Sequence, residues 1–277
     1  MGLTGTANGA LWGAQARDWA DIQEGQFRAA YEAVFDTLRS PPGTRVCDIG
    51  CGSGLAAQIA ASRGLEVCGL DAAEALLAIA RSRVPAGDFR LGDMEALPFA
   101  DGSADLVTGF NAFQYAGSPA AALAEAKRIV RASGAIVVMT WGQPQGMEAA
   151  TLVGALKPLL PPPPPGAPGP FALSDKAALE TLARSAGLRP AEIHDVTSAW
   201  TYPDLHAALR GLGSSGVAAR AIATSGEEAV RAAHHAALTP FRQSDGSYRI
   251  GVRFRWMLAR PEVAEALTRP NDAGLGP

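Results

Sequence analysis

The sequence has few cysteines, few aromatic residues and no excess of either charge. Its three cysteines, Cys47, Cys51 and Cys68, lack the paired-Cys or His spacing of a zinc site, so we expect buried thiols in a reducing cytoplasm. With 27 acidic and 24 basic residues among 277, the chain lacks the basic excess typical of nucleic-acid-binding surfaces. No apolar run approaches the ~20 residues of a transmembrane helix, and Met1 begins no signal segment. We therefore expect a cytoplasmic protein with no nucleic-acid partner and no membrane insertion.

The strongest pattern in the chain is a glycine-rich turn between an apolar strand and an alanine-rich helix. A strand is predicted over 46–49, Gly50, Gly52 and Gly54 follow it, and a helix begins at 55 and ends near Gly64. Glycines keep side chains away, so a ligand can lie directly on the turn and on the helix N-terminus. This pattern predicts a nucleotide-like ligand.

The spacing of the glycines argues against a dinucleotide. A dinucleotide fingerprint is G-x-G-x-x-G, and Leu55 stands where its third glycine belongs, so the spacing here is G-x-G-x-G. Asp48 precedes the first glycine, and Asp71 closes the next apolar run, 65–70. A carboxylate at the position of Asp71 can accept hydrogen bonds from both hydroxyls of a ribose.

Strand and helix patterns alternate through the first half of the chain. We predict helices over 11–39 and 72–81 and a helix N-capped by Ser118. The predicted strands beyond Asp71 are 89–91, 106–110 and 135–141. Alternation of this kind implies parallel strands joined by right-handed crossovers, with ligands at their carboxyl ends. Four polar residues are expected at that edge: Asp48, Asp71, Asp93 and Asn111.

These motifs together resemble the class I S-adenosylmethionine-dependent methyltransferases, in particular the small-molecule branch that resembles the ubiquinone and menaquinone biosynthesis enzymes. The resemblance rests on 46–54 (VCDIGCGSG), 69–72 (GLDA), 92–99 (GDMEALPF) and 105–107 (DLV), which leads into Asn111. Four motifs in the right order are more specific than one glycine loop. The segment RIVRASG, which ends at Gly134, resembles the family's RVLRPGG turn, and the change affects only loop stiffness.

The resemblance implies an α/β, doubly wound, mostly parallel seven-stranded sheet with an antiparallel last strand, the Rossmann-like methyltransferase fold, and a helical cap. It implies S-adenosyl-L-methionine as cofactor, S-adenosyl-L-homocysteine as product, and no metal. Asp71 would hold the ribose diol, Asp93 and Met94 would flank the adenine, and the Asn111 backbone would lie by the methionine amino group. Phe113 and Gln114 would border the methyl. The implied cofactor-binding residues are Asp48, Gly50, Gly52, Gly54, Asp71, Ala72, Asp93, Met94, Asn111, Phe113 and Gln114.

Beyond Trp141 the resemblance weakens. The Pro-rich stretch 158–165 predicts an extended surface connector, or else a ligand for a proline-reading domain. Ser174 is predicted to cap a helix that ends near Gly187, and two further strands are predicted over 191–200 and 249–258.

We divide the chain into an N-terminal helical cap (1–42), a methyltransferase domain (43–260) and a loosely held tail (261–277). Within the domain, residues 203–240 form a helical insertion that we expect to act as a lid, because a long connection in a compact domain is usually functional. We expect a monomer or a homodimer.

The proposed reaction is an in-line displacement that depends mainly on orientation, so no catalytic residue is assigned. The available proton carriers are His194, His206, His234, His235, Tyr31 and Tyr115. The acceptor is expected to be a small, largely apolar molecule methylated on O, N or C, because aromatic residues gather in the second half: Trp141, Trp200, Tyr202, Phe241 and Trp256.

Two alternatives stay open. One is a catalytically silent S-adenosylmethionine-binding module that partners another protein, for which the Pro-rich stretch is the only hint. The other is an NAD(P)-binding oxidoreductase, which shares the sheet but would lack here its third glycine and a Lys, Tyr or His catalytic signature.

Overall fold

The structure, a computed structural model, describes residues 4–162 and 169–262. Its centre is one seven-stranded sheet, and β-branched and other apolar residues dominate its buried strands. In chain order the strands are β1 (Arg45–Ile49), β2 (Glu66–Asp71), β3 (Asp88–Leu91), β4 (Ala104–Phe110), β5 (Val130–Trp141), β6 (Leu188–Tyr202) and β7 (Tyr248–Pro261).

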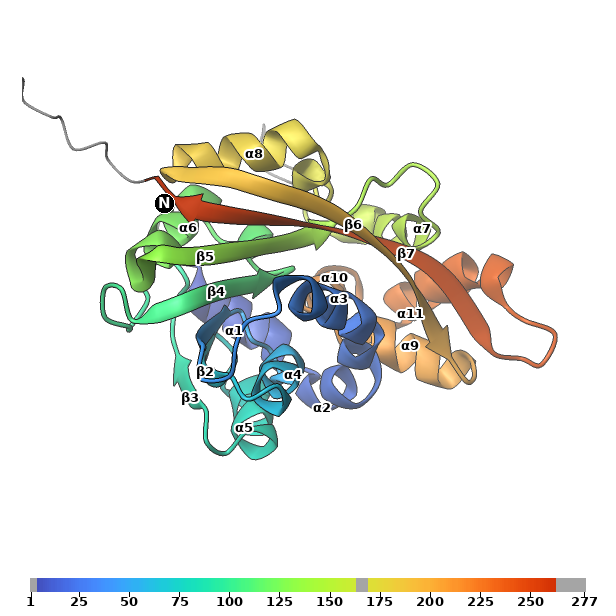
Figure 1. Ribbon diagram of the computed structural model, residues 1–277. Helices are drawn as coiled ribbons and strands as arrows, with labels where there is room; N and C mark the ends of the chain where they lie inside the picture. The colour runs from blue at the N-terminus through green and yellow to red at the C-terminus, as the bar shows by residue number, and fades with distance from the viewer. Residues whose placement is uncertain (1–3, 163–168, 263–277) are drawn as a thin grey trace, which may run out of the picture.

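The strand order across the sheet is β3-β2-β1-β4-β5-β7-β6 (Figure 1). The pairs β1–β2, β1–β4, β2–β3 and β4–β5 are parallel, whereas β7 runs antiparallel to both β5 and β6. The predicted fold class is therefore confirmed. The chain reverses its winding direction between β1 and β4, which is where open α/β sheets bind ligands.

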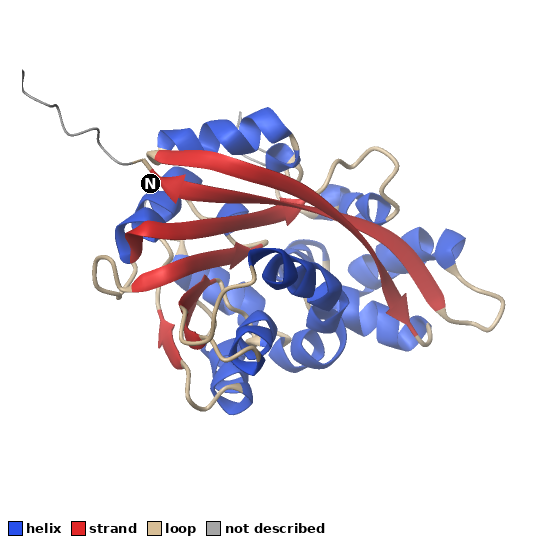
Figure 2. Cartoon of the chain, in the orientation of Figure 1, coloured by secondary structure: helices blue, strands red, loops and turns tan. Residues whose placement is uncertain are grey.

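Helices cover both faces of the sheet (Figure 2). The helices are α1 (Gly5–Gly13), α2 (Ala16–Asp18), α3 (Arg28–Leu38), α4 (Leu55–Ser62), α5 (Glu74–Arg83), α6 (Pro119–Ile129), α7 (Ala149–Ala155), α8 (Lys176–Ser185), α9 (Leu205–Gly213), α10 (Gly216–Ser225) and α11 (Glu227–Leu238). Residues of α3, α4 and the insertion share one core with β1, β4, β5 and β7, and residues of α6 and α8 share the other. α5 packs beside α4 over Phe89.

The N-terminal helical region differs from the expected pattern over 11–39. It begins at Gly5 and is broken into α1, α2, a π-helical turn (Trp19–Gln23), a 3₁₀ turn (Glu24–Phe27) and α3. α1 ends at Gly13, and glycine is a weak helix former because it loses the most backbone entropy. The breaks turn the chain so that the 19–27 segment lies over the glycine turn rather than along the sheet.

The second half of the sheet is longer than predicted. β5 starts at Val130, and β6 and β7 pair from Leu188↔Pro261 to Tyr202↔Tyr248, well beyond 191–200 and 249–258. Three helices, α9, α10 and α11, connect the far ends of these two strands (Figure 1). The lengths of these strands depend on pairing between distant segments, which a local sequence pattern does not predict.

The predicted cap Ser118 is confirmed, but the predicted cap Ser174 is wrong. Ser118 Oγ accepts a hydrogen bond from Ala121 N at the start of α6. Ser174 is buried at the end of a 3₁₀ turn, and its carbonyl accepts from Gln143 and Arg255. The next residue caps α8: its carboxylate accepts from Ala178 N at 2.9 Å, and its backbone has the extended conformation of an N-cap.

Two predicted segments lie partly outside the described residues. Of the Pro-rich stretch, 163–165 fall there, while Lys157–Leu159 forms a 3₁₀ turn. Of the predicted tail, 263–277 fall there as well. Within residues 4–162 and 169–262, no helix combines the length and the hydropathy needed to cross a bilayer.

Candidate functional site

The glycine turn lies at the carboxyl end of β1, at the point where the winding of the sheet reverses. Gly50, Gly52 and Gly54 have φ of 71°, 55° and 84°, the left-handed region that side chains disfavour. The backbone N–H groups of Gly50 and Cys51 both donate to the Leu70 carbonyl, which ties the turn to β2. The three glycines are therefore required by the turn itself, whatever ligand it binds.

Asp71 connects the glycine turn to the start of α5. One carboxylate oxygen accepts from Gly52 N and the other from Ala73 N, both at 2.8 Å. Burial raises the pKa of Asp71, and these backbone donors oppose that effect. Asp71 thus orders the two loops between which the predicted ribose would lie.

Asp48 is buried directly below the turn and is 3% exposed. Its carboxylate accepts a hydrogen bond from Thr108 Oγ1 of β4 at 2.7 Å. Burial raises the pKa of Asp48 to about 7; the Thr108 hydrogen bond lowers it, while the charges of Glu24 and Asp71 raise it further. A carboxyl group that titrates near neutrality at a ligand-binding edge is typical of a functional site.

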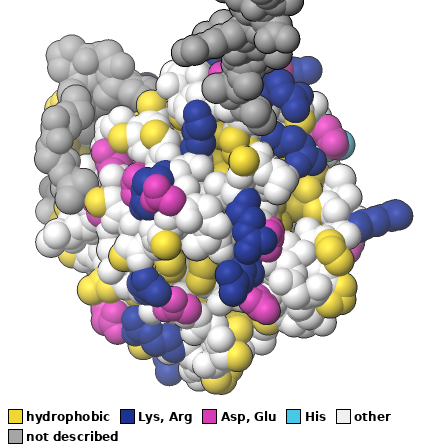
Figure 3. Space-filling view, turned by 60° about the vertical axis from the view of Figure 1, so that its left-hand side comes forward, with side chains coloured by type: hydrophobic (Ala, Val, Ile, Leu, Met, Phe, Trp, Pro, Cys, Tyr) yellow, Lys and Arg dark blue, Asp and Glu magenta, His cyan; other side chains and the backbone are white. Residues whose placement is uncertain are grey.

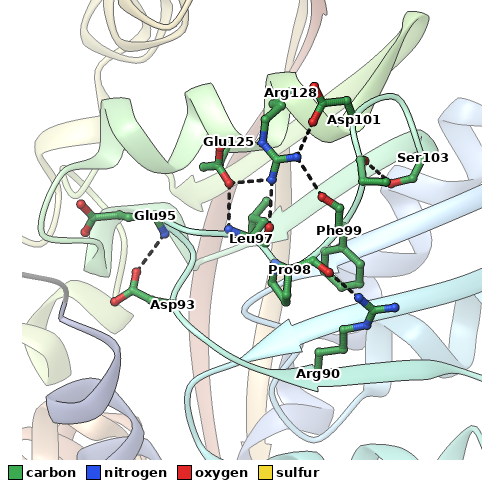
Figure 4. A network of polar contacts seen from close by, with 11 residues as sticks. Arg90, Asp93, Glu95, Leu97, Pro98, Phe99, Asp101, Ser103, Glu125 and Arg128 are labelled. Carbon is green, nitrogen blue, oxygen red and sulfur yellow. Dashed lines mark hydrogen bonds and ion pairs between the residues drawn. The ribbon is translucent and has the colours of Figure 1, made fainter.

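Asp93 begins a loop whose second half, residues 97–101, is held in place by Arg128 of α6 (Figure 4). The Arg128 guanidinium donates to the carbonyls of Leu97 and Phe99 and pairs with two carboxylates. Those carboxylates belong to Glu125, which also accepts from Leu97 N, and to Asp101. Met94 packs against the sheet, and the Asp93 carboxylate accepts from Glu95 N at 2.8 Å. The 93–101 loop is therefore fixed by side chains of α6.

Asn111 has an unusual backbone at the end of β4. Its φ is 51°, in the left-handed region, and it is one of two non-glycine residues with positive φ among the described residues. Its side-chain Oδ1 accepts from Gln114 Nε2 at 3.3 Å, while its buried Nδ2 has no partner in the described part of the chain. A buried unpaired donor is unfavourable, so it is a natural contact for a ligand.

Phe113 lies in the core and not beside the Asn111 side chain. Its side chain is 0% exposed and packs under Gly109 in the core formed with α6. The Phe113 ring is therefore part of the core, whereas the resemblance implied that Phe113 borders the methyl. Gln114, by contrast, is partly exposed and contacts Asn111.

Glu24 contacts the glycine turn, and the sequence did not indicate this contact. It lies in the N-terminal segment, is 3% exposed, and accepts hydrogen bonds from Ser53 N at 3.1 Å and Ser53 Oγ at 2.5 Å. Arg83 of α5 pairs with the same carboxylate and donates to the Ser53 and Ala20 carbonyls. Residues 24, 53 and 83 are far apart in the chain, so no local spacing could have identified this cluster.

α1 covers the carboxyl ends of β2 and β3. Gly5 N donates to the Asp93 carboxylate at 2.5 Å, and Asn8 Nδ2 donates to the Tyr115 carbonyl at 2.9 Å. A Cβ at Gly9 would lie 2.0 Å from the Ala72 carbonyl oxygen, so only glycine permits this approach. Two of the expected cofactor-binding residues, Ala72 and Asp93, are therefore in contact with α1.

The insertion packs on the same N-terminal segment. Trp12 lies against Gly216 at the start of α10, and Asp18 forms an ion pair with Arg210 of α9. Tyr202 OH donates to Gln23 at 2.7 Å in the interior. The N-terminal segment and the insertion thus contact each other above the sheet.

The proton carriers fall into different environments. His234 is buried, and desolvation lowers its pKa to about 4, whereas His206 and His235 are exposed. His194 stacks on Trp256 at the outer edge of the sheet. Burial raises the pKa of Tyr115 to about 12 and that of Tyr31 well above its usual value, so neither phenol is a base at neutral pH.

The aromatic residues of the second half gather in one core of the protein. Trp141 and Trp200 form a buried cluster with Phe27 of the N-terminal segment, with ring centroids 5.8 to 6.2 Å apart. The Trp200 Nε1 donor is buried and has no partner among the described residues. Trp256 is 1% exposed in the same core as Trp141 and Trp200, and its ring stacks on His194 with ring centroids 4.4 Å apart.

On the face drawn in Figure 3, basic side chains stand next to acidic ones. Among residues 4–162 and 169–262, no group of three or more His, Cys, Asp or Glu side chains is arranged to hold a metal ion.

Comparisons with known proteins agree with this architecture. Residues 47–138 match the family model described as a methyltransferase domain. The chain is 31% identical over 206 residues to malonyl-[acyl-carrier protein] O-methyltransferase of Erwinia pyrifoliae, covering 73% of each chain. It is 38% identical over 123 residues to demethylmenaquinone methyltransferase of Renibacterium salmoninarum, a match to 44% of this chain and about half (52%) of that relative.

A solved structure has the same fold. The YcgJ protein of Bacillus subtilis superimposes with a TM-score of 0.57 at 17% identity, covering 85% of this chain and 99% of that one. The family match includes the glycine turn, Asp71, the Asp93 loop and Asn111, and the Erwinia relative extends the likeness over most of the chain. The chain therefore belongs to the class I S-adenosylmethionine-dependent methyltransferases.

Proposed function

We propose that this protein transfers a methyl group from S-adenosylmethionine to a small, largely apolar molecule, leaving S-adenosylhomocysteine. The cofactor would supply an activated methyl on a sulfonium, which makes the leaving group neutral as it departs. The observation that carries the proposal is the buried acidic lining of the glycine turn. Glu24, Asp48 and Asp71 are all buried or half-buried there, with Arg83 as the paired cation.

This lining fits a cation better than a pyrophosphate. S-adenosylmethionine carries two positive groups and one carboxylate, so its net charge is positive, whereas a dinucleotide is an anion. At a helix N-terminus the backbone N–H groups normally receive a phosphate, but here Ser53 N and Leu55 N already donate to the Glu24 carboxylate. A phosphate at this turn would have to displace a buried anion, which disfavours the dehydrogenase alternative.

The residues of this chain would bind, orient and exclude water. Asp71 would face the ribose hydroxyls, and the 93–101 loop would flank the adenine. The unpaired Nδ2 of Asn111, oriented by Gln114, would donate to an oxygen of a ligand. α1 and the α9–α11 insertion would keep water from the reacting atoms, which increases the effective concentration of the acceptor at the methyl. No residue is assigned as a general base.

The acceptor class follows from the covering surface. The aromatic cluster of Phe27, Trp141 and Trp200 is buried where the N-terminal segment meets the carboxyl end of β5, and the Trp200 indole donor has no partner among the described residues. An acceptor that entered between the N-terminal segment and β5 would meet these apolar rings, which suit a molecule that carries few polar atoms. Two relatives are named for a menaquinone precursor and for malonyl-[acyl-carrier protein], so the acceptor differs among relatives of this chain.

Domain organisation, cellular compartment and partners are proposed as well. We propose a cap over 1–42, a methyltransferase domain over 43–260 and a lid over 203–240. A reducing cytoplasm is supported by the three free thiols, two of them buried. We propose no nucleic-acid partner and leave monomer and homodimer as alternatives.

Titration calorimetry with S-adenosylhomocysteine and with NADH tests the cofactor. We expect binding of the first and none of the second; the reverse result would refute the proposal. Transfer of a labelled methyl group to members of a panel of quinone-like, phenolic and polyketide-like compounds tests the reaction. Binding without turnover on any compound would favour the silent-module alternative, and a salt-sensitive transfer to nucleic acid would overturn the acceptor class.

A further inference from the structure

The Glu24 carboxylate is the most unusual buried group of the N-terminal segment. It reaches across to the glycine turn and accepts from both Ser53 donors and, at 3.5 Å, from Leu55 N. A carboxylate at a helix N-terminus is favourable in itself, but a simple cap comes from the residue just before the helix. Here the carboxylate comes from a residue 31 positions away from Leu55 in sequence.

The charges around the turn do not balance. Glu24, Asp48 and Asp71 are three acids, and the paired cation among them is Arg83. The charges of Glu24 and Asp71 act on Asp48, which places the three carboxylates within electrostatic range of one another. Water is largely excluded from this region, so each charge acts on a neighbouring ligand more strongly than it would at the surface.

We infer that Glu24 sets the preference of the site for the positively charged methyl donor over its neutral product. This inference rests on the proposed function. S-adenosylmethionine and S-adenosylhomocysteine have the same adenosine and amino-acid groups and differ by the methyl and the sulfonium charge. A negative charge near the turn therefore stabilises the donor more than the product, because only the donor carries the sulfonium, and this difference lets the spent cofactor leave.

The role is electrostatic and separate from the chemical step. Stabilising the sulfonium opposes its neutralisation during transfer, so the benefit of Glu24 lies in binding and exchange of the cofactor. Arg83 sets the strength of the effect, because it reduces the charge that Glu24 presents. Removing the acid and removing the base should then change donor-to-product selectivity in opposite directions.

The test compares the Kd of S-adenosylmethionine with that of S-adenosylhomocysteine for four proteins at about pH 8.5. Burial raises the pKa of Glu24, so a high pH is needed to favour its ionised form. In Glu24→Gln the preference for the donor should fall about tenfold, which corresponds to about 1.4 kcal/mol, through weaker donor binding. In Arg83→Gln the preference should rise. Glu74→Gln is the matched control: Glu74 pairs with Arg81 on the same helix, with side chains 58% and 41% exposed, and the ratio should not change.

The outcomes distinguish the inferred role of Glu24 from the proposed methyltransferase function. Equal weakening of both ligands in Glu24→Gln and Arg83→Gln would mean that the pair only supports the fold, and the inference would be overturned. The inference would also be overturned if the preference for donor over product fell in both variants or changed in neither. If Glu24→Gln does not fold, the direction of the change in Arg83→Gln still decides. If the native protein binds neither ligand, the proposed function itself has failed.

Discussion

Replacing Asp48 with Asn should remove a pH-dependent penalty from the folded protein. Burial raises the pKa of Asp48 to about 7 in the fold, from an ordinary value of 3.8. Because the pKa is raised in the folded state, the neutral carboxyl contributes to the stability of the fold. This contribution is complete below about pH 4 and is lost as the pH rises through 7. The difference between 7 and 3.8 corresponds to about 4 kcal/mol.

The measurement is denaturant unfolding of both proteins between pH 4 and pH 8.5. The Thr108 hydroxyl can donate to the Asn oxygen as it does to the carboxylate, so the variant keeps that hydrogen bond. The stability of Asp48→Asn relative to the native protein should increase by up to about 4 kcal/mol across this range, with most of the change between pH 4 and pH 7. At low pH the new amide N–H₂ group, if unpaired, costs about 1–3 kcal/mol, so the variant should be the less stable protein there.

A second variant fixes the interpretation. Thr108→Val removes the hydrogen bond that lowers the pKa of Asp48, so the pH dependence should move to higher pH with Asp48 still present. A stability difference between Asp48→Asn and the native protein that stays constant with pH would refute the reasoning, because Asp48 would then titrate alike in the folded and unfolded states.

Three further predictions concern the cofactor, the lid and the adenine-side loop. Asp71→Ala should weaken binding of S-adenosylhomocysteine by on the order of 2–3 kcal/mol in calorimetry, because a charged acceptor for two hydroxyls is lost. Residues 11–39 and 203–240 should gain hydrogen-exchange protection when S-adenosylhomocysteine binds, and Gly9→Val should reduce protection without ligand by forcing α1 off the sheet. Arg128→Ala should lower stability by about 1–2 kcal/mol and speed exchange of the loop it holds.

Each of the three has a result that contradicts it. Asp88→Ala, which removes an exposed acid paired with Arg90, should bind like the native protein, and equal losses in it and in Asp71→Ala would remove the ribose assignment. Equal, slow exchange of both covering segments with and without ligand would show that they are fixed core. Arg128→Lys keeps the charge but loses the planar fork, so native-like exchange in that variant would mean that geometry does not matter.

The sequence by itself determined the parallel half of the sheet and the edge at which the site lies. Gly50, Gly52 and Gly54 could be located because a tight turn with positive φ leaves a local signature. Asp71 and Asn111 could be located because parallel strands bring every carboxyl end to one edge. These inferences use short segments whose conformation depends on nearby residues.

The tertiary structure alone decided which side chains surround that edge. Glu24 and Arg83 meet at Ser53 only after the N-terminal segment folds back over the turn, and α1 reaches Asp93 only because Gly9 allows a close approach. The sequence placed Phe113 at the site because of its position in the chain. In the structure its side chain is buried in the core that the sheet shares with α6 and α8. Contacts between distant segments depend on the packing of the whole chain. That packing also buries the charged groups and so shifts their pKa values. Local sequence therefore predicts neither the contacts nor the pKa values.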